Sequence, residues 1–195
     1  MKHSFSMFGE LDAPPRVTVA AYLDCEHYVF LHRALTDSVE VVHQEGFQVT
    51  VRQSWEAFGL KLGHLKDGTF IPPFEFHLEN VRPEPYWIPS IHHFVGITTH
   101  LTYFDLKERD ATGFRFDVTL DLPFWLYPVR TILQRLIEKM HDQQNFEDMA
   151  MIKRRERLFG RGNTAAYVAE HQFLYHKDAY LKHFSPKNLS ELKAK

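Results

Sequence analysis

Residues 128–159, PVRTILQRLIEKMHDQQNFEDMAMIKRRERLF, decide the fold, because they form one long amphipathic pattern. A proline at position 128 suits the first turn of a helix, and Gly160 and Gly162 mark the end of the helix. Apolar side chains recur at the three- and four-residue spacing of a helix surface, at Ile132, Leu133, Leu136, Ile137 and Met140. The pattern predicts a long C-terminal helix whose apolar face must be covered by another layer of structure.

The sequence between Ser38 and Leu122 is typical of antiparallel strands, which provide such a layer. FQVTVRQSWEAFG (47–59) alternates apolar and polar side chains with the two-residue period of a β-strand. The period recurs in HFVGITTHLTYFDLKE (93–108) and TGFRFDVTLDLPF (112–124), with a turn between them. ENVRPEPYWIPS (79–90) holds three prolines, so it is expected to be a loop or a sheet edge.

Shorter elements flank these strands. HSFSMFG (3–9) predicts a first strand, and two helices are expected next, at about 14–23 and 25–33. A further helix is expected over residues 164–184, followed by a polar tail over residues 185–195. The pattern therefore predicts a single α+β domain over residues 1–184.

The order of these elements resembles that of a known fold family. One strand, two short helices, a run of antiparallel strands and a long C-terminal helix is the order of the helix-grip fold of the START-like, or SRPBCC, superfamily. The resemblance implies a curved sheet wrapped around the long helix, with a hydrophobic cavity between them. The helix side of that cavity is then expected to come from Leu133, Leu136, Ile137 and Met140.

Composition narrows the functional classes. Lys plus Arg number 23 and Asp plus Glu number 25, and this near-neutral balance argues against a nucleic-acid-binding protein. A single cysteine, Cys25, excludes a disulfide within the chain and any zinc or iron–sulfur site built from several cysteines. No apolar run approaches the roughly 20 residues of a transmembrane helix, and no signal peptide is recognised, so we expect a cytoplasmic protein.

The segment DCEHYVFLH (24–32) is the candidate functional segment. His27 and His32 are five residues apart, which separates them by about 140° around a regular α-helix. They can therefore face one ion only across a helix end or a π-type turn. The spacing leaves two interpretations open, a metal site or a capping acid with histidines that pack at the rim of the sheet.

A second resemblance favours the metal site. VAAYLDCEHYVFLHRA (19–34) is similar to the iron-binding segment of Rieske-type non-heme iron oxygenases, and NFEDMAMI (145–152) is similar to the segment that carries their acidic ligand. The resemblance implies that His27, His32 and Asp148 hold Fe(II), with Asp24 accepting a hydrogen bond from a ligand histidine. Two histidines and one carboxylate leave positions open for oxygen on the metal.

The chain departs from that family in two respects. The residues before Asp24 read VAAYL, where the family has an asparagine. A Rieske cluster needs two cysteines and two histidines, so one cysteine cannot support it within this chain. An oxygenase of this type would therefore need a separate electron-transfer protein.

Three hypotheses follow for function. The first is a START-like domain that binds a hydrophobic, aromatic or isoprenoid-like small molecule beside a mononuclear iron site and oxidises it with O2. The alternative is a metal-free carrier or sensor of a lipid-like ligand. The third is a cyclase-like enzyme in which a histidine acts as acid or base.

Overall fold

The computed structural model describes residues 1–32, 36, 38–57, 60–72, 74–83, 95–164 and 175–184. Two short 3-10 helices, η2 (Lys107–Arg109) and η3 (Tyr127–Val129), accompany the main elements. In chain order these are β1 (Lys2–Leu11), α1 (Pro15–Leu23), α2 (Cys25–Phe30), β2 (Ser38–Glu45), β3 (Gln48–Ala57), β4 (Leu60–Ile71), β5 (Glu75–Pro83), β6 (Gly96–Leu106), β7 (Ala111–Asp121), α3 (Arg130–Phe159) and α5 (Lys177–Phe184).

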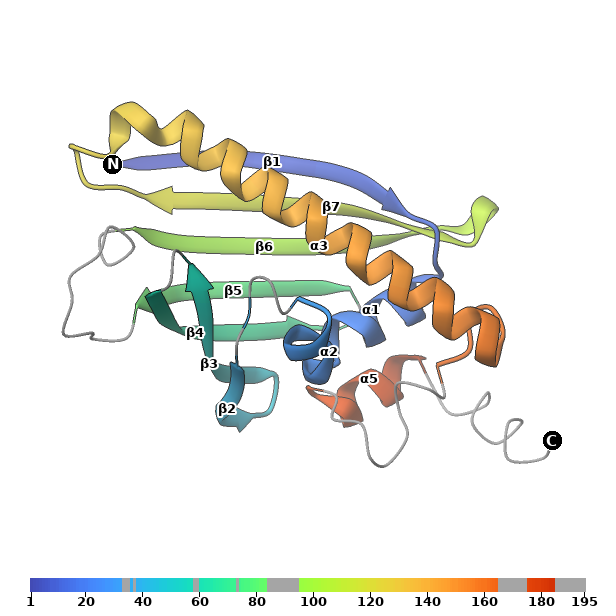
Figure 1. The fold of residues 1–195 in the computed structure, drawn as a ribbon. Coiled ribbons are helices and arrows are strands. Elements are labelled where there is room, and N and C mark those ends of the chain that lie inside the picture. Colours follow the sequence, from blue (N-terminus) through green and yellow to red (C-terminus); the bar gives the residue numbers. More distant parts are fainter. Residues whose placement is uncertain are drawn as a thin grey trace.

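The strands form one antiparallel sheet in the order β1-β7-β6-β5-β4-β3-β2. Its first strand pairs with its last along their whole length, from Lys2 opposite Asp121 to Leu11 opposite Thr112. The helix α3 lies across one face of this sheet (Figure 1). The α+β class and the helix-grip order predicted from the sequence are therefore confirmed.

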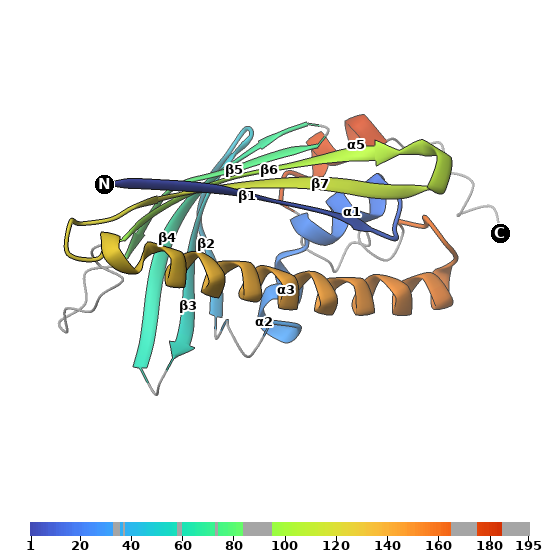
Figure 2. The same cartoon turned by 90° about the horizontal axis from the view of Figure 1, so that it is seen from above.

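The sheet is curved, and β3 and β4 bend toward the side on which α3 lies (Figure 2). The pairing register shifts between Val41 and His43, between Leu65 and Asp67, and between Leu78 and Val81. Such irregularities bend a strand and increase its local twist. Because all three lie in the β2–β5 half, this half turns toward the helix while β1, β7 and β6 stay extended.

The core lies in two places between the sheet and the helices. A larger cluster surrounds α1, whose Val19 and Ala20 are fully buried, and includes Phe70 and Tyr180. A smaller cluster lies between β7 and the start of α3, where Val118, Leu120 and Leu122 are buried. Small side chains in α1 let this helix sit between the sheet and the elements that cover it.

The long helix begins at Arg130, after Pro128 in η3, and ends before Gly160. The apolar stripe predicted for this helix is wider than the face that packs against the core. Leu133 and Ile137 contact the smaller core cluster, whereas Ile132 and Leu136 are 60% and 52% exposed. Successive helix positions turn by about 100°, so the residues that directly precede the packed positions point away from the sheet.

The other predicted elements are found with shifted ends. The second helix stops at Phe30 instead of reaching residue 33, and the first strand covers residues 2–11. Of the tail helix predicted over 164–184, α5 spans Lys177–Phe184, and residues 165–174 lie outside the described part. Most of the proline-rich segment 79–90 and the tail 185–195 also lie outside it. None of the described helices is long and apolar enough to cross a membrane.

Ile152 is the buried residue of α3, at 1% exposure, and it joins the helix to the larger core cluster. We expect Ile152→Ala to lower the free energy of unfolding by about 2–5 kcal/mol, because it leaves a cavity in the core. The matched control Ile132→Ala, on the exposed side of the same helix, should change it by about 0.5 kcal/mol or less. Urea unfolding followed by circular dichroism measures both, and equal losses would contradict the placement of α3.

Candidate metal and ligand site

The end of α2 brings the two histidines of the candidate segment together. His27 lies within the helix, and His32 follows two residues after its last residue, Phe30. The imidazole rings are 5.2 Å apart between centroids and stand at 83° to each other. Both side chains are buried, His27 at 5% and His32 at 1% exposure. The helix end thus removes the separation of about 140° that a continuous helix would impose.

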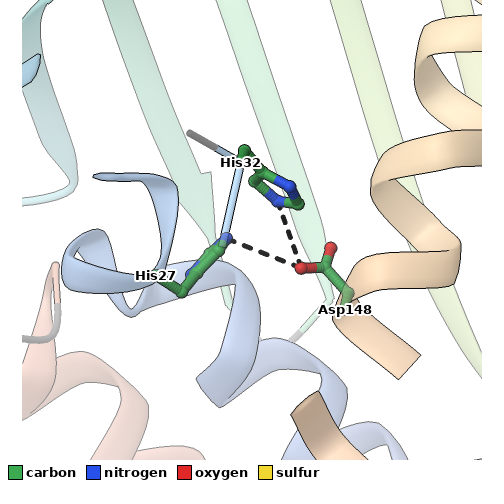
Figure 3. A group of neighbouring side chains, drawn as sticks. All are labelled: His27, His32 and Asp148. Carbon is green, nitrogen blue, oxygen red and sulfur yellow. Dashed lines mark ion pairs between the residues drawn. The ribbon is translucent and has the colours of Figure 1, made fainter. Parts of the chain in front are cut away.

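Asp148 reaches the same point from α3. Its Oδ1 atom is 3.2 Å from Nε2 of His32 and 3.8 Å from Nε2 of His27 (Figure 3). One ligand atom from each of the three residues lies within 4.8 Å of the others. The structure therefore brings together all three residues that the sequence predicts as metal ligands, although more than a hundred residues separate Asp148 from the histidines.

Glu147 holds His32 from the other side of its ring. Its Oε2 atom is 2.7 Å from Nδ1 of His32, and its Oε1 accepts a hydrogen bond of 3.0 Å from Gln143. With Nδ1 engaged in this way, Nε2 of His32 is directed toward Asp148. A carboxylate on the outer nitrogen of a ligand histidine is the usual means of fixing its orientation.

The sequence predicts that supporting role for Asp24, and it stays a prediction: the backbone and the charge of Asp24 act on His27, whereas Glu147 holds the other histidine, His32. Asp24, which is 1% exposed, ends α1, and its Oδ2 atom accepts hydrogen bonds of 3.2 Å from both terminal nitrogens of Arg155. This pairing follows from position, because α3 passes the end of α1 with Arg155 two turns after Asp148.

Burial and charge push the two histidines in opposite directions. Burial is the largest influence on His27 and lowers its pKa, despite the opposing effect of Asp148. Burial also acts to lower the pKa of His32, but the carboxylates of Asp148 and Glu147 together raise it above its ordinary value. At neutral pH His27 is therefore neutral, the form in which an imidazole nitrogen can bind a metal ion.

A cavity of about 220 Å³ lies between α3 and the sheet, and the three candidate ligands form part of its wall. Of the residues predicted for its helix side, Ile137 and Met140 line it. Leu133 instead packs on the smaller core cluster, and Leu136 points outward, for the geometric reason given for α3. The sheet side is mostly apolar and aromatic, with Ile97, Leu101, Tyr103, Phe114, Phe116 and Val118.

Two polar residues of this wall were missed in the sequence. His141 stacks on Phe116, with ring centroids 4.7 Å apart, and its Nδ1 atom is 3.1 Å from the amide nitrogen of Asn145. Lys66 of β4 points inward, because it shares strand parity with the buried Phe70. His141 lies two helical turns before Asp148, and this spacing could have indicated that both face the cavity. Lys66 gave no such signal, because a lysine in a strand ordinarily indicates the solvent face.

Lys66 lines both this cavity and a neighbouring one of about 80 Å³. Its ammonium group donates to Oε1 of Gln53, whose amide nitrogen donates to Oγ1 of Thr36 at 2.6 Å. Burial lowers the pKa of Lys66 from 10.5 to about 8. The cavity thus has an acidic group, Asp148, and a basic group, Lys66, in one largely apolar wall.

Comparison with known proteins identifies the fold class. No family model matches the chain, and no curated protein matches its sequence. The Zhui aromatase/cyclase of Streptomyces sp. R1128 superposes with a TM-score of 0.61 at 12% identity, over 80% of this chain and 96% of that one. A START superfamily protein of Mycobacterium smegmatis gives 0.56 at 13%, over 76% and 99% of the two chains. Ginseng major latex-like protein 151 of Panax ginseng gives 0.54 at 10%, over 75% and 95%.

These similarities establish the helix-grip, START-like fold for this chain. Identities of 10–13% say nothing further about chemistry, because one fold serves many functions. The oxygenase part of the resemblance therefore depends on the residues of the site alone.

The shifted pKa of Lys66 gives a prediction about stability. Between about pH 8 and 10.5 the unfolded chain keeps a proton on Lys66 that the folded chain has lost, so the free energy of unfolding should rise with pH in this window. The increase should be absent in Lys66→Met, which cannot titrate there. Urea unfolding at pH 7, 8, 9 and 10 measures it as the difference between wild type and variant. A difference that does not change with pH would show that the lysine has an ordinary pKa.

Proposed function

We propose that this chain is a START-like domain that binds an apolar small molecule in its larger cavity and holds a mononuclear metal ion, Fe(II), on His27, His32 and Asp148. The observation that carries the proposal is the convergence of these three side chains, from α2 and α3, at the wall of the cavity. Two imidazoles and one carboxylate beside a ligand cavity are the donor set of non-heme Fe(II) oxygenases.

The spacing of the donor atoms supports a metal ion. Ligand atoms about 2.0–2.2 Å from an ion stand roughly 3–3.5 Å from one another. Asp148 Oδ1 is 3.2 Å from His32 Nε2, within this range, and 3.8 Å from His27 Nε2, slightly outside it. The three ligand atoms as a set lie within 4.8 Å of one another, which is wider than this range, so the short segment that carries His27 would have to move by about 1 Å to complete the set.

An unsatisfied oxygen supports the same conclusion. Asp148 Oδ1 is buried and lacks a hydrogen bond of acceptable geometry, although it faces both imidazoles. Its contact with Nε2 of His32, at 3.2 Å, compensates this oxygen only in part. A cation among the three side chains would satisfy this oxygen and both Nε2 atoms together.

The chain's own residues would then have separate tasks. Glu147 holds His32 in the orientation that directs Nε2 to the site. The apolar wall of β6 and β7 binds the body of the ligand and excludes water from the open side of the site. Bound Fe(II) would supply the O2-dependent oxidation of the ligand, and a separate electron-transfer protein would supply electrons, because one cysteine cannot support a Rieske cluster.

A metal-free carrier of an aromatic or isoprenoid-like ligand is the second candidate, and the cavity itself favours it. The apolar lining serves a carrier as well as an enzyme, and the fold neighbours include a START superfamily protein and a major latex-like protein. In a carrier the histidine–carboxylate contacts would hold α2 against α3 and have no chemical task.

Iron content separates the two candidates. Wild type reconstituted with Fe(II) without oxygen, then freed of loose metal, should retain about one iron per chain. Asp148→Asn keeps the shape of the side chain but removes the anionic ligand, so it should retain less than roughly a tenth as much. Glu147→Gln should weaken iron binding by about 10–100-fold, because it only loosens His32. The matched control Asp142→Asn, exposed on the same helix, should bind iron like the wild type.

A titration with the neutral fluorescent probe N-phenyl-1-naphthylamine accompanies the elemental analysis. All four proteins should bind the probe, because its binding is driven by the burial of apolar surface, which contributes roughly 25 cal/mol per Å². Wild type that binds the probe and retains no iron would leave the carrier as the function. Wild type that binds neither would exclude both candidates.

A further inference from the structure

Lys66 is not part of the candidate metal site, although it lines the same cavity. On β4 it shares a face with Gly68 and Phe70, both buried, so its side chain is directed to the interior of the fold. It also lies where the two cavities meet, since Tyr22, Tyr28, Gln53 and Leu78 line both of them with it. A lysine that only served solubility would extend from the other face of this strand.

A row of hydrogen bonds fixes the groups around this lysine. Lys66 donates to the side-chain oxygen of Gln53, and the side-chain nitrogen of Gln53 donates to Thr36. The backbone nitrogen of Thr36 donates to the carbonyl oxygen of His32 at 2.8 Å. Gln53 is 7% and Thr36 2% exposed. The amide of Gln53 therefore cannot rotate without breaking both of its contacts, and the ammonium group is held at one point of the wall.

The ammonium group of Lys66 is part-buried in a mostly apolar wall. Burial lowers the pKa of Lys66 to about 8, because the protein interior disfavours the charged form. An anionic group that enters the cavity beside the lysine would be attracted to its charge, because opposite charges interact more strongly where water is partly excluded. A titratable group whose pKa is perturbed and which lines a cavity is a candidate for a functional site.

We infer that the cavity takes an amphiphilic acid, whose carboxylate is bound by Lys66 against Gln53 and whose apolar body lies along β6 and β7. This deepens the ligand-binding part of the proposed function and does not need the metal. The charge of Asp148 in the same wall repels a carboxylate from the histidine end and so sets one orientation of the ligand. The end of the ligand remote from the acid group then faces His27, His32 and Asp148.

Two probes of equal shape test this inference. Isothermal titration at pH 7 in the presence of EDTA compares 2-naphthoate with the neutral 2-naphthamide. Wild type should bind naphthoate about tenfold or more tightly than naphthamide, as a charge-assisted hydrogen bond in a buried site provides. EDTA removes metal ions, so that the carboxylate of the probe cannot bind to a cation on the histidines.

Two variants and one control assign the preference to the lysine. Lys66→Met keeps the length of the side chain and should reduce the preference to about twofold or less, with naphthamide affinity unchanged. Gln53→Glu keeps the hydrogen-bonding oxygen but places a negative charge against Lys66, so it should abolish the preference independently. Lys139→Met, on the exposed side of α3, should retain it.

Each result decides between alternatives. Naphthamide binding without a preference for naphthoate in the wild type would overturn the acid subsite and leave the apolar cavity of the proposed function intact. A preference that survives in Lys66→Met and Gln53→Glu would also overturn it, because the carboxylate would then bind elsewhere. Failure of both probes would reject the ligand-binding cavity itself, and the subsite with it.

Discussion

One face of α3 must meet two requirements that oppose each other. It packs on the sheet at Ile137 and on the cluster around α1 at Ile152, and these two residues tie the helix to the two core clusters. Between these points it must stand away from the sheet, where the cavity reaches Met140 and Asp148. The register shifts in β2, β4 and β5 reconcile the two, because they bend one half of the sheet around the helix. A flat sheet would meet the helix along its length and fill the cavity.

The same constraint explains how the side chains of the candidate site are held in place. Asp148 and Glu147 are carried by a long helix that is fixed at both ends, and α2 is short and ends between the histidines. The buried pair of Asp24 and Arg155 joins the start of α2 to α3, two helical turns from Asp148. Asp24 therefore acts on the site through position, by holding the histidine segment against the helix that carries the acid.

Much of this could be predicted from the sequence, for identifiable reasons. Pro128 and Gly160 lie close to the two ends of α3, because their effects on the backbone are local. The alternation of apolar and polar residues predicted the strands of the sheet. Asp148 was found only through resemblance, since no local pattern links it to His27. The outward direction of Leu136 and the inward direction of Lys66 could not be predicted. The elements packed against a helix set its rotation, and those packed against a strand decide which face is buried. The contact of Glu147 with His32 was not predictable for the same reason, because only tertiary structure places this acid beside the histidine.

The pairing of β1 with β7 also governs the order in which the chain can fold during synthesis. One hundred residues separate the end of β1 from the start of β7. At the ribosome's rate of about 5–20 residues per second, β1 waits roughly 5–20 s for β7, its one neighbour among the described strands. Throughout that interval its exposed edge can pair with strands of other nascent chains. Pairing between strands so distant in sequence is intrinsically slow to form, because the loop-closure entropy must be overcome before the contacts are made.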